Sequence, residues 1–231
     1  MCGRYTLRSR GSGKFYGVPL SQLPFLAPRY NIAPTQSVPV IIARGAVREL
    51  AMFQWGLIPS WSKEPKGFIN ARAETLPDKP SFGESFQRRR CLIPADGFYE
   101  WQRNGSIGRS KQPYFFQMKD EAPFAFAGIW DRWQSGDLSI TSCAIITTTP
   151  NELLETIHDR MPVILGDDEA QDSWLRSNTR PADLKELLVP FPGSRMKSFP
   201  VSSRVNGAEA DDAQLVEEVE IRQEPTTGRL F

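Results

Sequence analysis

The feature that most limits the fold of this chain is its proline content: 19 prolines are spread along 231 residues. A proline ring removes a backbone N–H and clashes with the preceding helical turn, so it is excluded from helix interiors and from most central strand positions. The sequence therefore predicts many short strands joined by loops, rather than long helices. The apolar share of 40% is ordinary, and a chain of this length can bury a sizeable core.

Six segments rich in β-branched and aromatic residues are predicted to be strands. They are Val38–Arg44, Arg48–Trp55, Phe98–Arg103, Tyr114–Met118, Phe124–Trp130 and Leu138–Thr147, with turn signals at Asn104-Gly105 and Ser135-Gly136. Short helices are predicted at Asn151–Ile157, Asp168–Arg176 and Ala182–Leu188, each placed after a proline or at acidic capping residues. Since strands do not alternate with helices, we expect a single β-rich α+β domain rather than a doubly wound parallel sheet.

The end of the chain, residues 208–231, is acidic and weakly apolar. We expect one domain over residues 1–222 and a mobile tail over residues 223–231. No apolar run approaches the roughly 20 residues of a membrane span, and the N-terminus lacks the apolar stretch of a signal peptide. These features predict a cytoplasmic protein that does not contact membranes.

The net charge of +1 hides an asymmetry between the two halves of the chain. Residues 1–120 carry 18 Lys and Arg and 8 Asp and Glu (18 − 8 = +10), whereas residues 121–231 carry 10 and 19 (10 − 19 = −9). A basic half suits a polyanion such as nucleic acid. The alternative is that both halves fold into one body in which the charges intermix.

The sequence offers no pattern for a cofactor. It contains neither of the glycine-rich phosphate-binding motifs, and its three cysteines and single histidine fit no zinc pattern. We therefore expect chemistry without a metal or a nucleotide.

Cys2 is the first candidate for chemistry. Removal of the initiator methionine would leave an N-terminal cysteine, whose α-amine has a pKa of roughly 7.7–8.0 and is partly unprotonated at neutral pH. Such an amine can form a Schiff base with an aldehyde, and the neighbouring thiol can then close a five-membered thiazolidine ring. The alternative is that Cys2 is merely an exposed terminal residue.

Two titratable side chains could move protons. His158 is the only histidine, and its unperturbed pKa of roughly 6.5 suits proton transfer near neutrality. Glu100 lies between Tyr99 and Trp101, and in a strand it would point to the opposite face from both. A carboxyl group among aromatic rings is desolvated and can act as an acid. The alternatives are a packed structural histidine and a solvated glutamate.

The segment Asn70-Ala71-Arg72-Ala73-Glu74 alternates polar residues with alanine, so an extended chain would place its polar side chains on one face. Arg72 suits a phosphate, although a surface ion pair with Glu74 is equally compatible with the sequence. Trp55 and Trp61 flank a bent loop. We expect Trp55 in the core and Trp61 at the rim of a site, where aromatic rings stack on unpaired bases. Cys91 and Cys143 are predicted to be small buried apolar residues.

In this order, these motifs resemble the SRAP family, named for "SOS response-associated peptidase". The matching segments cover residues 1 to about 207 and are 1–5, 29–35, 55–61, 69–75, 90–101, 111–114, 126–130, 157–162 and 200–202. The resemblance implies a curved, mostly antiparallel, barrel-like sheet with few helices. It also implies covalent crosslinking of an N-terminal cysteine to abasic sites in single-stranded DNA.

By the same resemblance, the catalytic residues would be Cys2, Asn70, Glu100 and His158, and the DNA contacts would be Arg4, Pro34, Trp61, Arg72 and Arg160. A monomer is implied as well. Two other functions fit some of these residues: a cysteine autopeptidase using Cys2 with His158, and a non-catalytic module that binds single strands.

Overall fold

The computed structural model describes residues 2–9, 14–19, 26–102 and 111–221, and its strands form two main sheets. The first is five-stranded, in the order β15 (Met196–Pro200), β10 (Pro113–Met118), β9 (Gly97–Trp101), β1 (Arg4–Leu7) and β4 (Arg29–Ile32). The second contains β5 (Ser37–Arg44), β6 (Val47–Trp55), β7 (Asn70–Arg72), β8 (Arg90–Ala95), β11 (Phe124–Ser135), β12 (Leu138–Thr148), β13 (Met161–Pro162) and β14 (Ile164–Leu165).

Five strands of the second sheet close into a barrel. The ring runs β12–β6–β5–β8–β11 and returns to β12, because β11 pairs with both β8 and β12. All of these pairs are antiparallel except β6–β12, in which Trp55 lies beside Cys143. Strand β7 also runs parallel to β12, so that Asn70 lies beside Ile145. The predicted mostly antiparallel, barrel-like α+β fold is confirmed.

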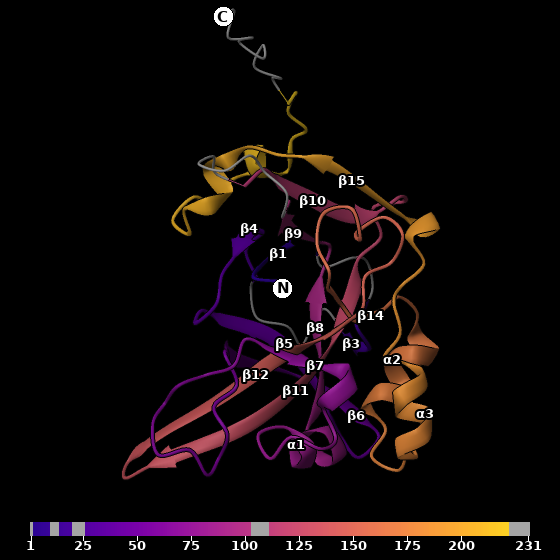
Figure 1. Cartoon of the computed structure of the whole chain (residues 1–231). Helices are drawn as coiled ribbons and strands as arrows, with labels where there is room; N and C mark the ends of the chain where they lie inside the picture. Colours follow the sequence, from indigo (N-terminus) through magenta and orange to yellow (C-terminus); the bar gives the residue numbers. More distant parts are fainter. Residues whose placement is uncertain (1, 10–13, 20–25, 103–110, 222–231) are drawn as a thin grey trace, which may run out of the picture.

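The five-stranded sheet lies over one end of the barrel, at the top of Figure 1. Aromatic side chains fill the space between them: Tyr5 from β1 meets Trp55 and Phe126 edge-on, and Phe98 stacks on Phe116. Burial of such rings is the main favourable term in folding. Trp55, Cys91 and Cys143 are fully buried, as predicted.

Helices are few and short. They are α1 (Gly83–Arg88), α2 (Asp168–Leu175) and α3 (Pro181–Glu186), with 3₁₀ turns at Ala73–Thr75, Gly193–Arg195, Ser203–Asn206 and Ala213–Val216. Helix α2 begins as predicted, with the Asp167 side chain accepting a hydrogen bond from the Ala170 N–H. No helix among the described residues is long and apolar enough to cross a membrane.

One predicted helix is wrong. Residues 151–157 form consecutive turns, not a helix. The Asn151 side chain caps the first turn by accepting from the backbone N–H groups of Leu153 and Leu154, and it donates to the Phe191 carbonyl. The chain then leaves the turn at His158, which lies beside Glu100. Tertiary contacts at both ends therefore override the local helical preference.

The segment after residue 207 is part of the fold. Asp211 accepts hydrogen bonds from the backbone of Tyr30 and Asn31 on β4, and Val219 N–H donates to the Pro200 carbonyl at the end of β15. Between these two points Leu215 is fully buried in a second, smaller core that contains Tyr99 and Phe115. We call residues 208–221 the C-terminal strap. The predicted tail, residues 223–231, and the Asn104-Gly105 turn lie outside the described residues.

Candidate active site between the two sheets

Cys2 lies where the five-stranded sheet meets the barrel, and it is fully buried. It precedes β1, which pairs with β9 so that Arg4 lies opposite Tyr99. Burial raises the pKa of the Cys2 thiol, and the nearby Glu100 carboxylate raises it further. The thiol therefore carries its proton at neutral pH. The alternative of an exposed terminal residue does not hold.

Asn70 joins the barrel to Cys2. It begins β7, and its side-chain Nδ2 donates to the Cys2 carbonyl at 2.9 Å. The other end of the amide, Oδ1, is buried and accepts no hydrogen bond from the described residues. An unsatisfied buried acceptor costs about 1–3 kcal/mol, so this oxygen is suited to accept from a group that arrives with a ligand.

Glu100 and His158 face one another beside Cys2. Glu100 is 1% exposed and points away from Tyr99, which packs into the second core, so the predicted alternation along β9 is confirmed. Its Oε2 lies 3.8 Å from His158 Nε2. The backbone N–H of Arg160 lies 3.1 Å from His158 Nδ1, and the Asp159 carboxylate lies 3.2 Å from the same nitrogen, so Nε2 is the ring nitrogen on the side of Glu100.

Arg160 and Arg4 border the same region, and both are already held by the protein. Arg160 forms a bidentate ion pair with Glu74 at 2.6 and 2.9 Å and donates to the Thr147 carbonyl. Arg4 donates to the backbone carbonyls of Val205 and Asn206, and burial lowers its pKa. Each guanidinium keeps a buried Nε–H with no hydrogen-bond partner among the described residues.

The remaining predicted DNA contacts lie further out. Arg72 is exposed, and among the described ion pairs Glu74 is held by Arg160 rather than by Arg72. Pro34 is half-buried and precedes Thr35, whose φ of 72° marks a tight turn. Trp61 is 64% exposed, with its indole N–H donating to the Pro80 carbonyl at 3.3 Å.

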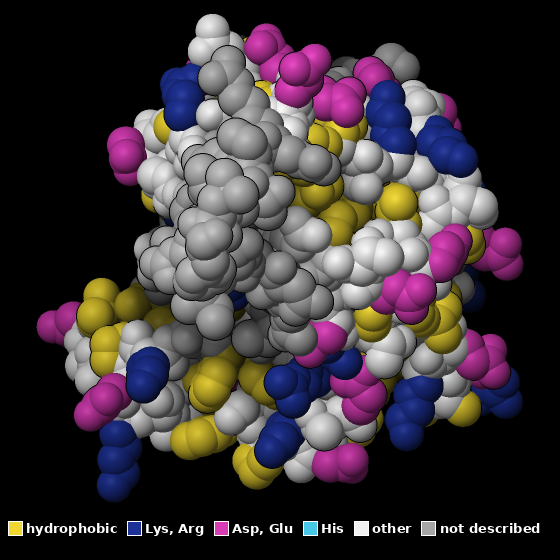
Figure 2. Space-filling model, turned by 45° about the horizontal axis from the view of Figure 1, so that its top comes forward, with side chains coloured by type: hydrophobic (Ala, Val, Ile, Leu, Met, Phe, Trp, Pro, Cys, Tyr) yellow, Lys and Arg dark blue, Asp and Glu magenta, His cyan; other side chains and the backbone are white. Residues whose placement is uncertain are grey.

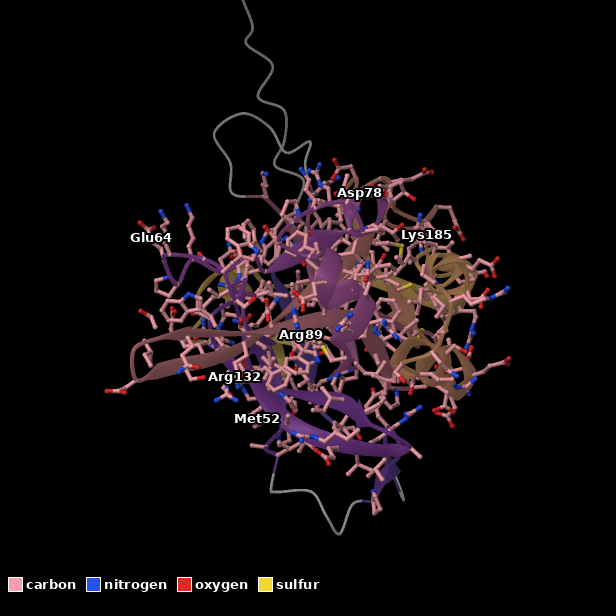
Figure 3. All side chains as sticks on the ribbon, turned by 90° about the horizontal axis from the view of Figure 1, so that it is seen from below. Met52, Glu64, Asp78, Arg89, Arg132 and Lys185 are labelled. Carbon is pink, nitrogen blue, oxygen red and sulfur yellow. The ribbon has the colours of Figure 1, made fainter. Side chains whose placement is uncertain are left out.

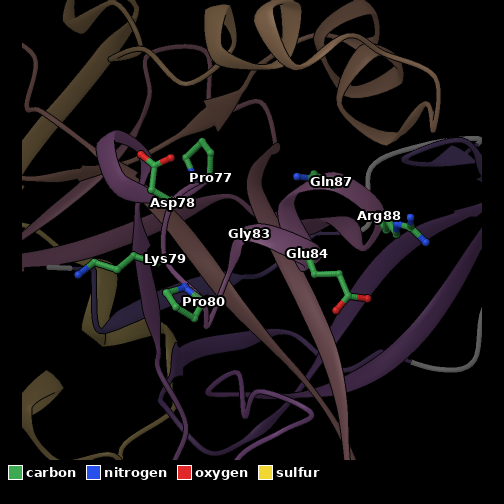
Figure 4. A pocket seen from close by; sticks show the side chains of 8 residues that line it. All are labelled: Pro77, Asp78, Lys79, Pro80, Gly83, Glu84, Gln87 and Arg88. Carbon is green, nitrogen blue, oxygen red and sulfur yellow. The ribbon is translucent and has the colours of Figure 1, made fainter.

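Beside the Trp61 loop lies a surface pocket of about 490 Å³ (Figure 4). Its lining residues are Pro77, Asp78, Lys79, Pro80, Gly83, Glu84, Gln87 and Arg88, so basic and acidic side chains alternate around it. It contains none of the predicted site residues. Among the described residues, no group of three or more His, Cys, Asp and Glu side chains is arranged to hold a metal ion.

The two halves of the chain mix their charges. Arg29 pairs with Asp211, Arg48 with Asp172 and Arg160 with Glu74. Basic and acidic side chains also lie side by side on the face shown in Figure 2. Among the described residues, charges from the two halves therefore intermix, as the alternative expected.

The structure brings together Cys2, Asn70, Glu100 and His158, with Arg4 and Arg160 at the edge, whereas Trp61 lies outside this cluster. Sequence reasoning missed the pairing of Glu74 with Arg160 across 86 positions of sequence. It also gave no role to Trp101, whose indole donates to the Asn206 side chain at 2.7 Å beside Arg4. No local signal could have revealed either contact, because both join distant segments.

Comparisons with known proteins identify the family of this chain. The family model described as "SOS response associated peptidase (SRAP)" matches residues 1–208. The chain is 44% identical to the abasic site processing protein YoqW of Bacillus subtilis, over 94% of this chain and 99% of that one. It is 35% identical to the abasic site processing protein HMCES of Xenopus tropicalis, over 78% of this chain and 63% of that one.

A crystal structure of a protein from Bacteroides thetaiotaomicron superimposes with a TM-score of 0.80 at 29% identity. It covers 95% of this chain and 100% of that one. The match to the family model spans every residue that the sequence predicts to be catalytic or to contact DNA. The chain belongs to the SRAP family.

Proposed function

We propose that this protein recognises abasic sites in single-stranded DNA and bonds to them covalently through Cys2, once Met1 has been removed. The observation that carries the proposal is the meeting of four side chains in one cluster: Cys2 and Glu100, which are buried, and Asn70 and His158, which are half-buried. Relatives named as abasic site processing proteins support the substrate class.

The chemistry needs one aldehyde and one aminothiol. An abasic sugar opens to a C1′ aldehyde, and protonation of the ring oxygen by Glu100 promotes this opening. The Cys2 amine adds to C1′, water leaves, and a Schiff base forms. The thiol then adds to the same carbon, its proton passes to the nitrogen, and a thiazolidine results. Aldehyde and aminothiol thus give the ring and one water, with no oxidant or reductant.

The site is suited to this order of events. Since the pKa of the thiol is raised, the amine is the better first nucleophile, and sulfur enters only in the intramolecular step. The free Asn70 Oδ1 can accept from the Cys2 amine or from a sugar hydroxyl. His158, whose Nε2 faces Glu100, can relay protons to and from that carboxyl group during ring closure.

The raised pKa also bears on the rival autopeptidase. A cysteine peptidase works through a thiolate paired with an imidazolium, whereas here burial and the Glu100 carboxylate both disfavour the thiolate. A non-catalytic binding module would not explain why Cys2, Glu100 and His158 lie together. Neither rival predicts a covalent product with abasic DNA.

The test is a denaturing gel with abasic single-stranded DNA, combined with intact-protein mass spectrometry. Processed protein should give a heat-stable adduct that maps to the N-terminal peptide. Protein that retains Met1 should give no thiazolidine, because its Cys2 nitrogen is an amide. Cys2→Ser and Cys2→Ala should give at most a labile, reducible adduct. The control is Cys91→Ala, which removes another buried thiol and should crosslink normally. A heat-stable adduct on protein that retains Met1 would refute the mechanism.

A further inference from the structure

The loop that carries Trp61 is held in place by several backbone and side-chain hydrogen bonds. We call residues 56–68 the tryptophan loop. At its base, Leu57 and Phe68 exchange two backbone hydrogen bonds of 2.9 Å each. Gly56 has a φ of +135°, and a Cβ on Gly67 would lie 2.3 Å from the Gly56 oxygen, so the base fits only glycine at both positions.

Side chains of the long β11–β12 hairpin bind the first half of the loop. Asp131 and Ser142 lie opposite each other in the hairpin. Ser142 Oγ accepts from the Ile58 N–H at 2.8 Å, and Asp131 Oδ2 accepts from the Ser60 N–H at 2.8 Å. The Asp131–Ser142 pair thus accepts hydrogen bonds from the N–H groups of residues 58 and 60, as the carbonyl groups of a neighbouring strand would.

Trp61 itself lies in a tight turn whose far end is also held. The Ser62 N–H donates to the Pro59 carbonyl at 2.9 Å, which closes a four-residue turn with Trp61 in its third position. The Trp133 indole donates to the Ser62 carbonyl at 2.7 Å. The backbone of Trp61 is therefore held on both sides and its indole N–H donates to the Pro80 carbonyl, while the residue stays 64% exposed. In Figure 3, the loop around Glu64 lies beside the hairpin that carries Arg132.

The clamp is built from one face of β11. Asp131 and Trp133 are buried and face the loop, whereas Trp130 and Arg132 lie on the other face. The Asp131 carboxylate is further fixed by the Arg132 N–H at 2.8 Å and by Arg89 at 3.3 Å. Because the Asp131 carboxylate is buried and contacts several donors, it is held in a single orientation. The turn that it binds is therefore held in a single orientation too.

We propose that Asp131 and Trp133 are positioning residues for nucleic-acid binding, which hold Trp61 ready to stack on an unpaired base of the DNA. The inference rests on the proposed DNA-binding role of Trp61. A ring that is already fixed loses little conformational freedom on stacking, so the clamp raises affinity without touching the DNA.

A double-mutant cycle tests this with undamaged single-stranded DNA, measured by fluorescence anisotropy. Trp61→Ala should weaken binding roughly fivefold or more, the range for loss of one stacked base. Trp133→Phe keeps a ring but removes the hydrogen bond to Ser62, and should weaken binding roughly twofold to tenfold. In the Trp61→Ala background, Trp133→Phe should weaken binding by less than a further twofold, because the side chain that Trp133 positions is absent.

Matched variants separate positioning from a general loss of stability. Trp130→Phe makes the same change on the other face of β11 and should bind like wild type. Asp131→Ala should weaken binding, and Asp131→Asn, which retains an acceptor for the Ser60 N–H, should restore most of the affinity. Thermal unfolding of every variant shows whether the protein remains folded at the assay temperature.

Three results would overturn the proposal: Trp133→Phe weakening binding equally in both backgrounds, Trp133→Phe binding like wild type, or Trp61→Ala binding like wild type. Absence of strand binding by the wild-type protein would overturn it as well. Since undamaged DNA cannot crosslink, the cycle can still be read if no covalent adduct ever forms. Failure of the proposed chemistry and failure of this inference are therefore distinguishable.

Discussion

The C-terminal strap is expected to be essential for stability, although all of it after its first residue lies beyond the family model, which ends at residue 208. Leu215 is fully buried in the second core, against the layer that holds Tyr99 and Phe115. Leu215→Ala removes its outer side-chain carbons and leaves a cavity, a change that costs about 2–5 kcal/mol in buried sites. For a chain of this size each kcal/mol lowers Tm by roughly 2–4 °C, so we expect a decrease of roughly 5–15 °C.

The assay is thermal unfolding followed by circular dichroism or calorimetry. Leu138→Ala is the matched control, because the same side chain is 56% exposed at the β11–β12 turn and its loss should cost less than about 0.5 kcal/mol. Equal Tm values for wild type and Leu215→Ala would refute the reasoning that the strap is part of the core. Arg4 rests on the carbonyls of Val205 and Asn206, so we also expect adduct formation to slow in Leu215→Ala.

Three further outcomes are expected. Glu100→Gln cannot supply a proton and should slow adduct formation by ~10²-fold in a single-turnover gel assay, whereas normal rates would exclude Glu100 as the acid. Crosslinking should be faster on single-stranded than on duplex abasic DNA, and binding should weaken with salt; equal rates on both forms would contradict a site for unpaired bases. The hydrogen bond from Arg160 lowers the pKa of Glu74, so its stabilisation is present above the ordinary pKa of roughly 4.3 and is lost as pH falls through the lowered value. Unfolding of Glu74→Gln and wild type should therefore differ at pH 7 and converge in acid, and a constant difference would contradict the ion pair.

Local pattern predicted the regular hairpins well. The segments around Gly45 and Gly136 are rich in β-branched and aromatic residues and meet at turn residues, and both form hairpins close to the predicted bounds. Strand β8, with the sequence RCLIPA, was missed because it has one β-branched residue and no aromatic residue. Strands β1 and β4 are four residues each, too short for a period to show.

The residues of the candidate site could be named from the sequence, but their geometry could not. Motif order singled out Asn70 and His158. That Asn70 holds the Cys2 carbonyl and that His158 faces Glu100 depends on pairings between segments more than 50 residues apart. The same holds for the clamp on Trp61, since a tryptophan in a bent loop gives no sign of which strand holds that loop.

An odd number of strands cannot alternate in direction all the way around a ring, and this has a consequence for how the protein folds. The parallel pair within the ring, β6–β12, places Trp55 beside Cys143, a separation of 143 − 55 = 88 residues. The hairpins β5–β6 and β11–β12 can each form locally, but this contact needs a long loop to close and should form late. Next to it, β12 also pairs with β7, which carries Asn70, so we expect the ring to close and the site around Cys2 to assemble together. A chain still emerging from the ribosome, with β12 unmade, would have its reactive cysteine but no site around it.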